Sequence, residues 1–468
     1  MGSPGGRCGG PVSSTTGILD ASPVGDRAQN GRLMAVRFDP EVLRNDPEHR
    51  RRVLEVLSAA VSAVDPVAAV GRHLERFGAT LRVGEHEVPV PSGRIVVLAV
   101  GKAAVPMARS AVSRLDGLSI CGAVAAPEAA EIPGLEVMVG GHPLPDEGSL
   151  RAGRRLLELA HAAGPDDLVL VLISGGGSAL AEYPLPGLGL ADLRAMSDAL
   201  LRAGAPIAEI NLVRRHLSAL KGGRLAAAAA PARLAGLVVS DVIGSALEVI
   251  AGGPTVPDST SAAEALDVLS ARGVVPPGAV SDVLQHSPDD GIGIGAAGGM
   301  LSVIADGSMA ARAACEEAKR LGLVATLGST SVEGEAAEVG RTLAEDGRRL
   351  APGVMLIHAG ETTVTVSGRG RGGRNQELAL AAGIALEGHP GILVAGFGTD
   401  GIDGPTPAAG GIGDAGTASR GWSAGRDARV ALETNDSATF LEATGDQLRC
   451  GATGTNVGDL MVVYRDAG

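Results

Sequence analysis

Short apolar runs alternate with segments of helical period along most of the chain. Residues 94–100, 167–173 and 235–240 are rich in Val, Leu and Ile, and a helical pattern follows the first of these runs from Ala103. Strands without polar interruptions that alternate with helices are typical of a parallel sheet covered on both faces. The pattern therefore predicts an α/β fold with mainly parallel, Rossmann-like sheets.

A second α/β series follows a segment rich in Gly, Pro and Asp at about residues 276–299. We expect strands at 300–305, 324–328, 354–358, 362–366 and 391–395, and helices at 308–321, 335–349 and 375–386. At roughly 100–200 residues per domain, the 468 residues suit two domains. We predict an N-terminal α/β domain over residues 45–290 and a C-terminal α/β domain over residues 291–468.

Composition narrows the class of protein. The net charge is −13 and aromatic residues make up 1% of the chain. A basic stripe and stacking aromatics mark nucleic-acid binders, so we expect no nucleic-acid partner. Since the chain as a whole is acidic, an anionic substrate would need a local cluster of cations and backbone N–H groups.

The N-terminus and the cysteines point to an intracellular protein without a membrane span. Residues 1–35 are rich in Gly, Ser and Pro and lack the apolar segment of a signal peptide, so we expect a disordered tail or a wrongly assigned start. No apolar run reaches the length of about 18 residues that spans a bilayer. The four cysteines are far apart and form no C-x-x-C motif, which favours reduced thiols in the cytoplasm.

The run Ser-Gly-Gly-Gly-Ser at residues 174–178 directly follows an apolar strand. Glycine permits positive φ and lets backbone N–H groups converge on an anion. A plain tight turn is the simpler alternative. We favour anion binding, and the candidate binding residues are Ser174, Gly175, Gly176, Gly177 and Ser178.

A second glycine-rich loop, at residues 368–373, matches G-x-G-x-x-G and is expected to open a helix. It carries Arg369 and Arg371, with Arg374 and Asn375 directly after it. Guanidinium groups beside a helix N-terminus suit a phosphate chain or a carboxylate. A solvated Gly/Arg turn is the alternative. The earlier match at 293–298 precedes a predicted strand instead of following one, so we interpret it as a linker.

Further cations follow strands or share one predicted helix. Lys102 comes directly after the strand at 94–100 and suits a point charge on a phosphate. Arg214, Ser218 and Lys221 have the spacing of one helix face, and His216 lies between them. A basic helix end that interacts with the helix dipole is nearly as good an explanation.

The acidic candidates are Asp241, Glu361, Asp400 and Asp403. Asp241 and Asp400 close apolar strands, where a carboxylate can hold Mg²⁺ or accept a hydroxyl proton. Each of them could instead cap a helix. For Asp403, in Gly-Ile-Asp-Gly-Pro, a turn residue is the favoured role.

Taken together, ordered strings along the chain resemble one family, the glycerate 2-kinases of the MOFRL type. Among them are Gly-Lys-Ala-Ala from Gly101, Gly-His-Pro-Leu-Pro-Asp from Gly141, Asn-Leu-Val-Arg-Arg-His from Asn211, Gly-Thr-Asp-Gly-Ile-Asp from Gly398 and Thr-Gly-Thr-Asn-Val from Thr453. The resemblance extends from about residue 47 to the end of the chain.

This resemblance implies two α/β domains with the active site in the cleft between them. It also implies ATP- and Mg²⁺-dependent phosphorylation of D-glycerate at its 2-hydroxyl. The active-site lysine of the family corresponds to Lys102 and its active-site arginine to Arg374. Phosphoryl transfer depends on positioning and charge stabilisation, so Asp241 would accept the hydroxyl proton or bind metal together with Asp400. The number of subunits is left open, a homodimer included.

Some positions depart from the family pattern, and two other functions stay open. Ser245 stands where an acidic residue is usual, Gly253 replaces a Ser, Asp306 replaces an Asn and Ala452 replaces a Pro. These changes allow a non-catalytic ligand-binding relative. The loop at 368–373 allows a nicotinamide-dependent hydroxypyruvate reductase, although no acidic residue about 20 positions further on suits a ribose.

Overall fold

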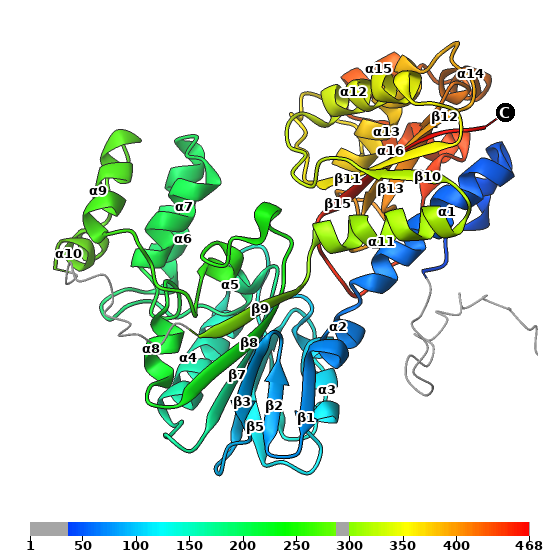
Figure 1. Cartoon of the computed structure of the whole chain (residues 1–468). Coiled ribbons are helices and arrows are strands. Elements are labelled where there is room, and N and C mark those ends of the chain that lie inside the picture. The colour runs from blue at the N-terminus through cyan, green and yellow to red at the C-terminus, as the bar shows by residue number, and fades with distance from the viewer. Residues whose placement is uncertain (1–35, 287–298, 468) are drawn as a thin grey trace, which may run out of the picture. The chain divides into compact units, whose positions relative to one another are not determined.

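The computed structural model describes residues 36–286 and 299–467 (Figure 1). The tail predicted over residues 1–35 and the linker match at 293–298 lie outside these ranges. The described residues confirm the α/β class, since they form two six-stranded sheets and one three-stranded sheet, with helices between the strands.

The first large sheet has the order β6-β5-β4-β7-β8-β9 and is parallel throughout, as predicted. Its central strand β7 (Leu168–Ser174) is buried along its whole length. The other strands are β4 (Ile95–Val100), β5 (Ile120–Ala126), β6 (Leu135–Val139), β8 (Arg233–Val239) and β9 (Met300–Ala305). Because all strands run the same way, their carboxyl ends meet at one edge, and Lys102, the 174–178 loop and Asp241 follow them there.

Strand β9 changes the organisation expected from the sequence. We assigned residues 300–305 to the second series, but β9 pairs with β8 and completes the first sheet. Helix α11 (Gly307–Arg320) then leads to β10 (Val324–Leu327) of the second sheet. The domain boundary at 290/291 stays a prediction.

Helices connect the strands of the first sheet, and several begin with local capping groups. Helix α4 (Glu147–His161) has a capping box, in which the Asp146 side chain accepts from the Ser149 backbone N–H. The others are α3 (Ala104–Arg114), α5 (Gly177–Leu180), α6 (Leu190–Arg202), α7 (Ile207–His216), α8 (Arg224–Ala229), α9 (Ala262–Ala271) and α10 (Gly278–His286). Helices α6, α7, α9 and α10 share a separate hydrophobic cluster.

The N-terminal part of the described chain adds two helices and a small sheet. Helices α1 (Pro47–Ala63) and α2 (Pro66–His73) begin with the capping residues Asp46 and Asp65. The antiparallel strands β1 (Leu74–Phe77), β2 (Thr80–Val83) and β3 (His86–Pro89) follow in sequence order.

The second large sheet has the order β10-β11-β15-β12-β13-β14. Only β10 and β11 (Val354–Gly360) are parallel, so the prediction of a mainly parallel second sheet is wrong. The cause is β15 (Asp459–Arg465), which inserts between β11 and β12 (Ile392–Gly398) and runs antiparallel to both. The remaining strands, β13 (Gly410–Asp414) and β14 (Gln447–Leu448), pair antiparallel as well.

The helices of this second part are α12 (Ala336–Arg349), α13 (Arg374–Ala385), α14 (Thr417–Ser423), α15 (Ala428–Glu433) and α16 (Ser437–Thr444). Helix α13 is capped by a distant residue, because Asp403 accepts hydrogen bonds from the backbone N–H groups of Asn375 and Gln376 at 3.0 and 2.9 Å. Asp403 is therefore not the simple turn residue that we expected.

Two local predictions are wrong. Residues 362–366 form no strand, since only a single bridge joins Thr363 to Glu335. The basic helix ends at His216, so Ser218 and Lys221 do not continue the face of Arg214 as the spacing suggested. Ser218 instead lies in a bridge to Pro184.

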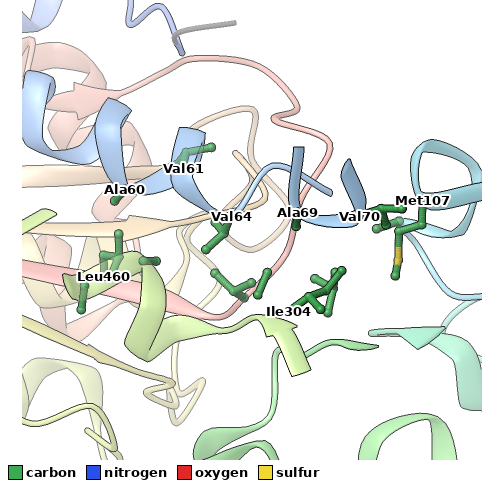
Figure 2. Close-up of a cluster of buried hydrophobic side chains, with 14 of the residues drawn as sticks. Ala60, Val61, Val64, Ala69, Val70, Met107, Ile304 and Leu460 are labelled. Carbon is green, nitrogen blue, oxygen red and sulfur yellow. The ribbon is translucent and has the colours of Figure 1, made fainter. Parts of the chain in front are cut away.

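One hydrophobic cluster contains residues of both large sheets. Figure 2 shows Leu460 of β15, Val61 and Val64 at the end of α1, Val70 of α2 and Ile304 of β9 within it. Each of these side chains is at most 4% exposed. Helices α1 and α2 thus share one continuous core with both sheets.

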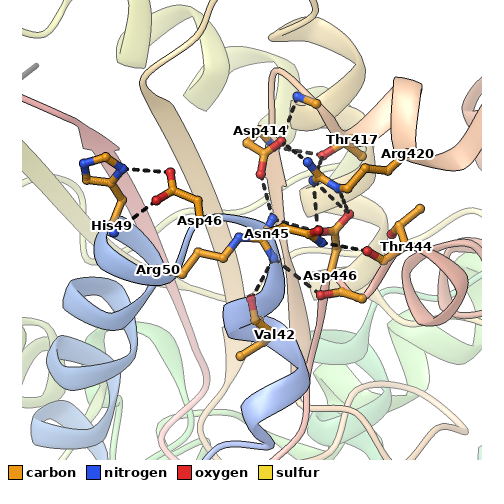
Figure 3. A network of polar contacts seen from close by, with 12 residues as sticks. Val42, Asn45, Asp46, His49, Arg50, Asp414, Thr417, Arg420, Thr444 and Asp446 are labelled. Carbon is orange, nitrogen blue, oxygen red and sulfur yellow. Dashed lines mark hydrogen bonds and ion pairs between the residues drawn. The ribbon is translucent and has the colours of Figure 1, made fainter.

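A buried polar network lies where β13 ends and β12 begins (Figure 3). Arg50 of α1 is fully buried and donates to Asp414 at 2.6 Å and to Asp446 at 2.7 Å. Arg420 donates to Asp446 at 2.9 Å. Buried charges need such pairing, and here it fixes the first turns of α1 to the second sheet.

No single helix in the ranges 36–286 and 299–467 meets the length and hydropathy of a membrane span. Helices α1 and α2 meet them only when they are taken together across a bend of 48°.

Candidate active site

The glycine loop, residues 174–178, brings backbone and side chains together at the end of β7. A Cβ atom on Gly176, whose φ is +79°, would lie 3.1 Å from the ring of His142. A Cβ atom on Gly175 would lie 2.0 Å from Asp241 Oδ2. Only glycine lets the backbone approach these two side chains so closely.

The two serines of the glycine loop have different surroundings. Ser174 is 2% exposed, and its Oγ accepts a hydrogen bond from the Ala103 N–H at 3.0 Å, so it fixes the start of α3. Ser178 is half-buried, and its carbonyl accepts from Arg214 Nη2 at 3.1 Å. The N–H groups of Gly177 and Ser178 belong to the first turn of α5 and have no acceptor within that helix. Ser178 and these N–H groups can therefore face an anion, whereas Ser174 cannot.

Lys102 lies beside the glycine loop. Its backbone N–H donates to the Gly175 carbonyl at 2.9 Å, and its Cγ is 3.2 Å from the position of a Cβ on Gly176. The Lys102 residue is exposed. Partial burial lowers the pKa of His142, and the Lys102 ammonium lowers it further. A mobile ammonium and a neutral imidazole therefore flank the same backbone turn.

Asp241 follows β8 and adjoins groups from both large sheets. Its Oδ2 accepts from Asn456 Nδ2 at 3.0 Å. Burial raises the pKa of Asp241, the Glu361 and Asp400 carboxylates raise it further, and Lys102 opposes them. Asp241 is thus the point at which the strand ends of the first sheet meet those of the second.

Arg374, the first residue of α13, is held by two carboxylates. Its Nε and Nη2 donate to Asp459 at 2.6 and 3.0 Å, and its Nη1 donates to Glu361 at 2.7 Å. Burial disfavours the charge of Arg374, but the hydrogen bonds to Asp459 outweigh this effect and its pKa is raised. The guanidinium therefore stays charged in a fixed orientation.

Asp459 opens β15 and is 1% exposed. Burial raises its pKa to about 6, although the hydrogen bonds from Arg374 lower it. Asp403, which caps α13, is also buried, and burial raises its pKa. The second sheet thus offers one cation, Arg374, on a base of buried carboxylates.

The remaining acidic candidates bear on the predicted metal. Asp400 is half-buried and accepts from the Ile402 N–H at 3.0 Å. In the described part of the chain, no three His, Cys, Asp or Glu side chains are grouped closely enough to hold a metal ion on their own. Mg²⁺ is commonly bound by one or two carboxylates together with substrate phosphates. Asp241, with Glu361 and Asp400 near it, fits this weaker requirement.

His216 and Lys221, two predicted binding residues, are engaged inside the protein. Lys221 is 2% exposed and forms an ion pair with the buried Glu182, and burial lowers its pKa to about 8. His216 is 6% exposed, and its Nε2 contacts Thr260 Oγ1 at 2.9 Å. The end of α7 at His216 turns these side chains into the interior, so we no longer include them among the ligand-facing groups.

The loop at residues 368–373 uses its backbone internally and does not form a phosphate cradle. The N–H groups of Gly368 and Arg371 donate to Asn435 Oδ1 at 2.9 Å and to Asp436 Oδ1 at 3.0 Å. A Cβ on Gly368 would lie 2.1 Å from the Thr434 carbonyl oxygen. The glycines therefore serve close packing against this backbone. The Arg371 side chain is 62% exposed and lies 4.0 Å from a Glu442 carboxylate.

Asn375 is 1% exposed, so it lies beneath Arg374 and cannot contact a ligand directly. Its backbone N–H donates to Asp403, and its side chain contributes a hydrogen bond to Asp459. Asn375 thus helps to hold the carboxylates on which Arg374 rests.

Sequence reasoning missed three residues of this site: His142, Asn456 and Asp459. His142 and Asn456 lie in strings that we had already matched to the kinase family, and Asp459 follows the second of these strings after two residues. We had looked for side chains after predicted strands, whereas Asp459 begins a strand.

Comparison with known proteins agrees with this arrangement. Residues 52–285 match a domain of unknown function, DUF4147, and residues 354–459 match the MOFRL family. The D-glycerate 2-kinase of Thermotoga maritima is 40% identical over 442 residues, which cover 91% of this chain and 99% of that protein. The glycerate 2-kinase of Pyrococcus horikoshii is 37% identical and covers 87% of this chain and 96% of its own length.

A solved structure extends the similarity to the fold. The crystal structure of glycerate kinase from Thermotoga maritima superposes with a TM-score of 0.79 at 37% identity, covering 90% of this chain and all of that one. The identity, the coverage and the two matched domains all agree, and the chain belongs to the MOFRL-type glycerate kinase family.

Proposed function

We propose that this protein is an ATP-dependent kinase that phosphorylates D-glycerate at its 2-hydroxyl and releases 2-phosphoglycerate and ADP. The relatives named as glycerate 2-kinases support the reaction. One observation carries the placement of the site. The Asp241 carboxylate interacts with Lys102 and with Glu361, and Glu361 is the ion-pair partner of Arg374. Cations from both sheets therefore adjoin one carboxylate.

In this reaction the 2-hydroxyl oxygen attacks the γ-phosphorus of ATP. The bond from the γ-phosphorus to the bridging oxygen breaks, ADP leaves with that electron pair, and the hydroxyl proton passes to Asp241. Asp241 suits this step because burial raises its pKa, and a more basic carboxylate accepts the proton more readily.

Lys102 and Arg374 stabilise the charge that develops on the transferring phosphoryl group. The Lys102 ammonium is exposed and can follow the phosphate as a point charge, whereas Arg374 is fixed by its carboxylates. Preorganised charges of this kind are the main source of catalysis in phosphoryl transfer. The N–H groups of Gly177 and Ser178 would receive the glycerate carboxylate or a phosphate.

Mg²⁺ would be held by Asp241 together with the phosphates of ATP, and would neutralise phosphate charge when bound. Glu361 and Asp400 lie near enough to Asp241 to raise its pKa. They are the further carboxylates on which such an ion could draw.

Phosphorus NMR of the product from ATP and D-glycerate tests the proposal. We expect the resonance of 2-phosphoglycerate to grow in proportion to that of ADP, and no reaction with the variant Lys102→Ala. A 3-phosphoglycerate signal would contradict the predicted position of transfer. No ADP formation with glycerate would contradict the kinase itself.

The alternatives lose the observations that supported them. A nicotinamide-binding loop at residues 368–373 would need free N–H groups, but those of Gly368 and Arg371 are occupied. Ser245 donates to Asp306 Oδ2 at 3.2 Å, so two of the departures from the family pattern contact each other. Gly253 has a φ of +60°, which favours glycine. Oxidation of NADH by hydroxypyruvate without ATP would revive the reductase.

A further inference from the structure

The loop between β14 and β15, residues 449–458, approaches both proposed catalytic groups. Asn456 donates its Nδ2 hydrogen to Asp241 Oδ2 at 3.0 Å. Asp459, three residues later at the start of β15, accepts from two nitrogens of Arg374 at 2.6 and 3.0 Å. One short segment therefore contacts a carboxylate from the first sheet and a guanidinium from the second.

The loop itself is fixed by hydroxyl groups. Thr399, fully buried at the end of β12, donates to the Gly458 carbonyl at 2.6 Å and accepts from the Val457 N–H at 2.9 Å. Thr455 is 4% exposed and donates to the Val64 carbonyl at 2.9 Å, in the connection between α1 and α2. Asn456 and Asp459 thus project from a backbone that has little freedom to move.

Asp459 and Glu361 hold Arg374 in different ways. Asp459 is 1% exposed and takes two parallel hydrogen bonds, the arrangement in which a carboxylate fixes the plane of a guanidinium. Glu361 makes one hydrogen bond through a side chain that is 45% exposed. A phosphate can therefore displace Glu361 more easily than Asp459, and the orientation of Arg374 depends on Asp459.

We infer that the β14–β15 loop is the positioning element of the active site, in which Asp459 orients Arg374 and Asn456 orients Asp241 for phosphoryl transfer. This inference rests on the proposed kinase function. Neither residue is a catalytic residue here, since each acts through the group that it holds. The pair sets the separation of the proton acceptor from the cation that stabilises the phosphoryl group.

A buried ion pair could also serve stability alone, and the protein contains a matched control. Asp446 is fully buried and accepts from Arg50 and Arg420 at 2.7 and 2.9 Å (Figure 3). It lies at the opposite edge of the second sheet, because Asp414 beside it pairs with Leu393 near the start of β12, while Asp459 pairs with Gly398 at its end. Asp446→Asn should therefore lower stability and leave kcat unchanged.

The first experiment is a double-mutant cycle on kcat with Asp459→Asn and Arg374→Gln, using ATP and D-glycerate with the full chain. A catalytic group misplaced by about 1 Å costs on the order of 100-fold in rate, so we expect Asp459→Asn to lower kcat about 100-fold. The KM for glycerate should change little. In the Arg374→Gln background the same substitution should have no further effect, because the guanidinium it orients is gone. Single-turnover measurements at high enzyme concentration make the weak activities accessible.

Several results would overturn the role of Asp459. One is a kcat of Asp459→Asn within threefold of the wild type. Another is an equal loss in both backgrounds, which would mean that Asp459 acts through the fold. Asp459→Glu, which keeps the charge but moves the fork, covers the case in which the Asn variant does not fold, and it should also lower kcat. If wild-type protein does not turn over ATP with glycerate, the proposed function fails before the cycle begins.

Asn456 is tested through the pH profile of kcat. Its hydrogen bond favours the charged form of Asp241, so Asn456→Ala should move the acid limb of the profile to higher pH. The charged groups that act on Asp241 are Lys102, Glu361 and Asp400, and all three remain in this variant. An unchanged acid limb with a normal thermal midpoint would overturn the role of Asn456.

Discussion

Replacing Gly175 by Ala should displace Asp241 without changing the fold. A Cβ atom at this position would lie 2.0 Å from Asp241 Oδ2 and 2.5 Å from its Cγ. Cβ atoms in proteins hardly ever come within 3.0 Å of another heavy atom in this way. The carboxylate must therefore move by about 1 Å. Gly175 does not have a positive φ, so Ala adds no left-handed strain.

The size of the effect follows from this displacement. A misplacement of about 1 Å at a catalytic group lowers the rate about 100-fold, which corresponds to about 2.7 kcal/mol in activation free energy. The same movement stretches the 3.0 Å hydrogen bond from Asn456. We expect kcat of Gly175→Ala to fall about 100-fold, and the KM for ATP to change much less.

The assay is ADP release at saturating ATP and glycerate, with the thermal midpoint measured on the same preparations. Gly278→Ala is the control, because no heavy atom lies within 4 Å of a Cβ there and its φ is not positive. It should keep the wild-type kcat and gain at most about 1 kcal/mol of stability. If Gly175→Ala retains kcat within threefold of the wild type, the position of Asp241 does not limit the reaction and the argument fails.

Three further predictions concern charge. Lys102→Ala should lower kcat at least about 100-fold with an unchanged thermal midpoint, while the exposed Lys319→Ala should change neither quantity; a near-normal kcat would remove Lys102 from the site. The folded-state pKa of Asp459, about 6, lies above its ordinary value, so the folded protein binds more protons in between, and stability relative to Asp459→Asn should rise by about 1.4 kcal/mol per pH unit as pH falls from 6 towards 4. Urea unfolding at several pH values measures this slope, and a zero or opposite slope would contradict it. Arg50→Ala should cost about 3–5 kcal/mol, because it leaves the buried Asp446 short of a partner; a loss below about 1 kcal/mol in urea titrations would show that the network is not stabilising.

The first sheet and its part of the site were largely predictable from the sequence. Parallel strands announce themselves as uninterrupted apolar runs, and their ligand-binding ends follow directly in the chain. Lys102, the glycine loop and Asp241 all lie directly after such runs. Each could be found from a local pattern, because strand direction and chain order coincide in this sheet.

The second sheet could not be predicted in the same way. Strand β15 comes from the end of the chain and enters the middle of the sheet in the opposite direction. Its first residue, Asp459, therefore lies at the edge where β12 ends, a position that a search after strand ends cannot reach. The cap of α13 by Asp403 is likewise a contact between distant segments. Such pairings depend on tertiary structure, which no local period encodes.

The charges of the site impose a condition on any anionic substrate. Carboxylates of Asp459, Glu361 and Asp403 all act on Arg374, while Glu361 and Asp400 act on Asp241. Lys102 and Arg374 face more negative than positive charge from these neighbours, and the chain as a whole is acidic. ATP and glycerate add further negative charge, so their binding requires a compensating cation or the uptake of protons. The raised pKa values of Asp241 and Asp459 supply part of this compensation. A divalent cation that arrives with the nucleotide would supply the rest, which gives the excess of carboxylates a function in place of a cost.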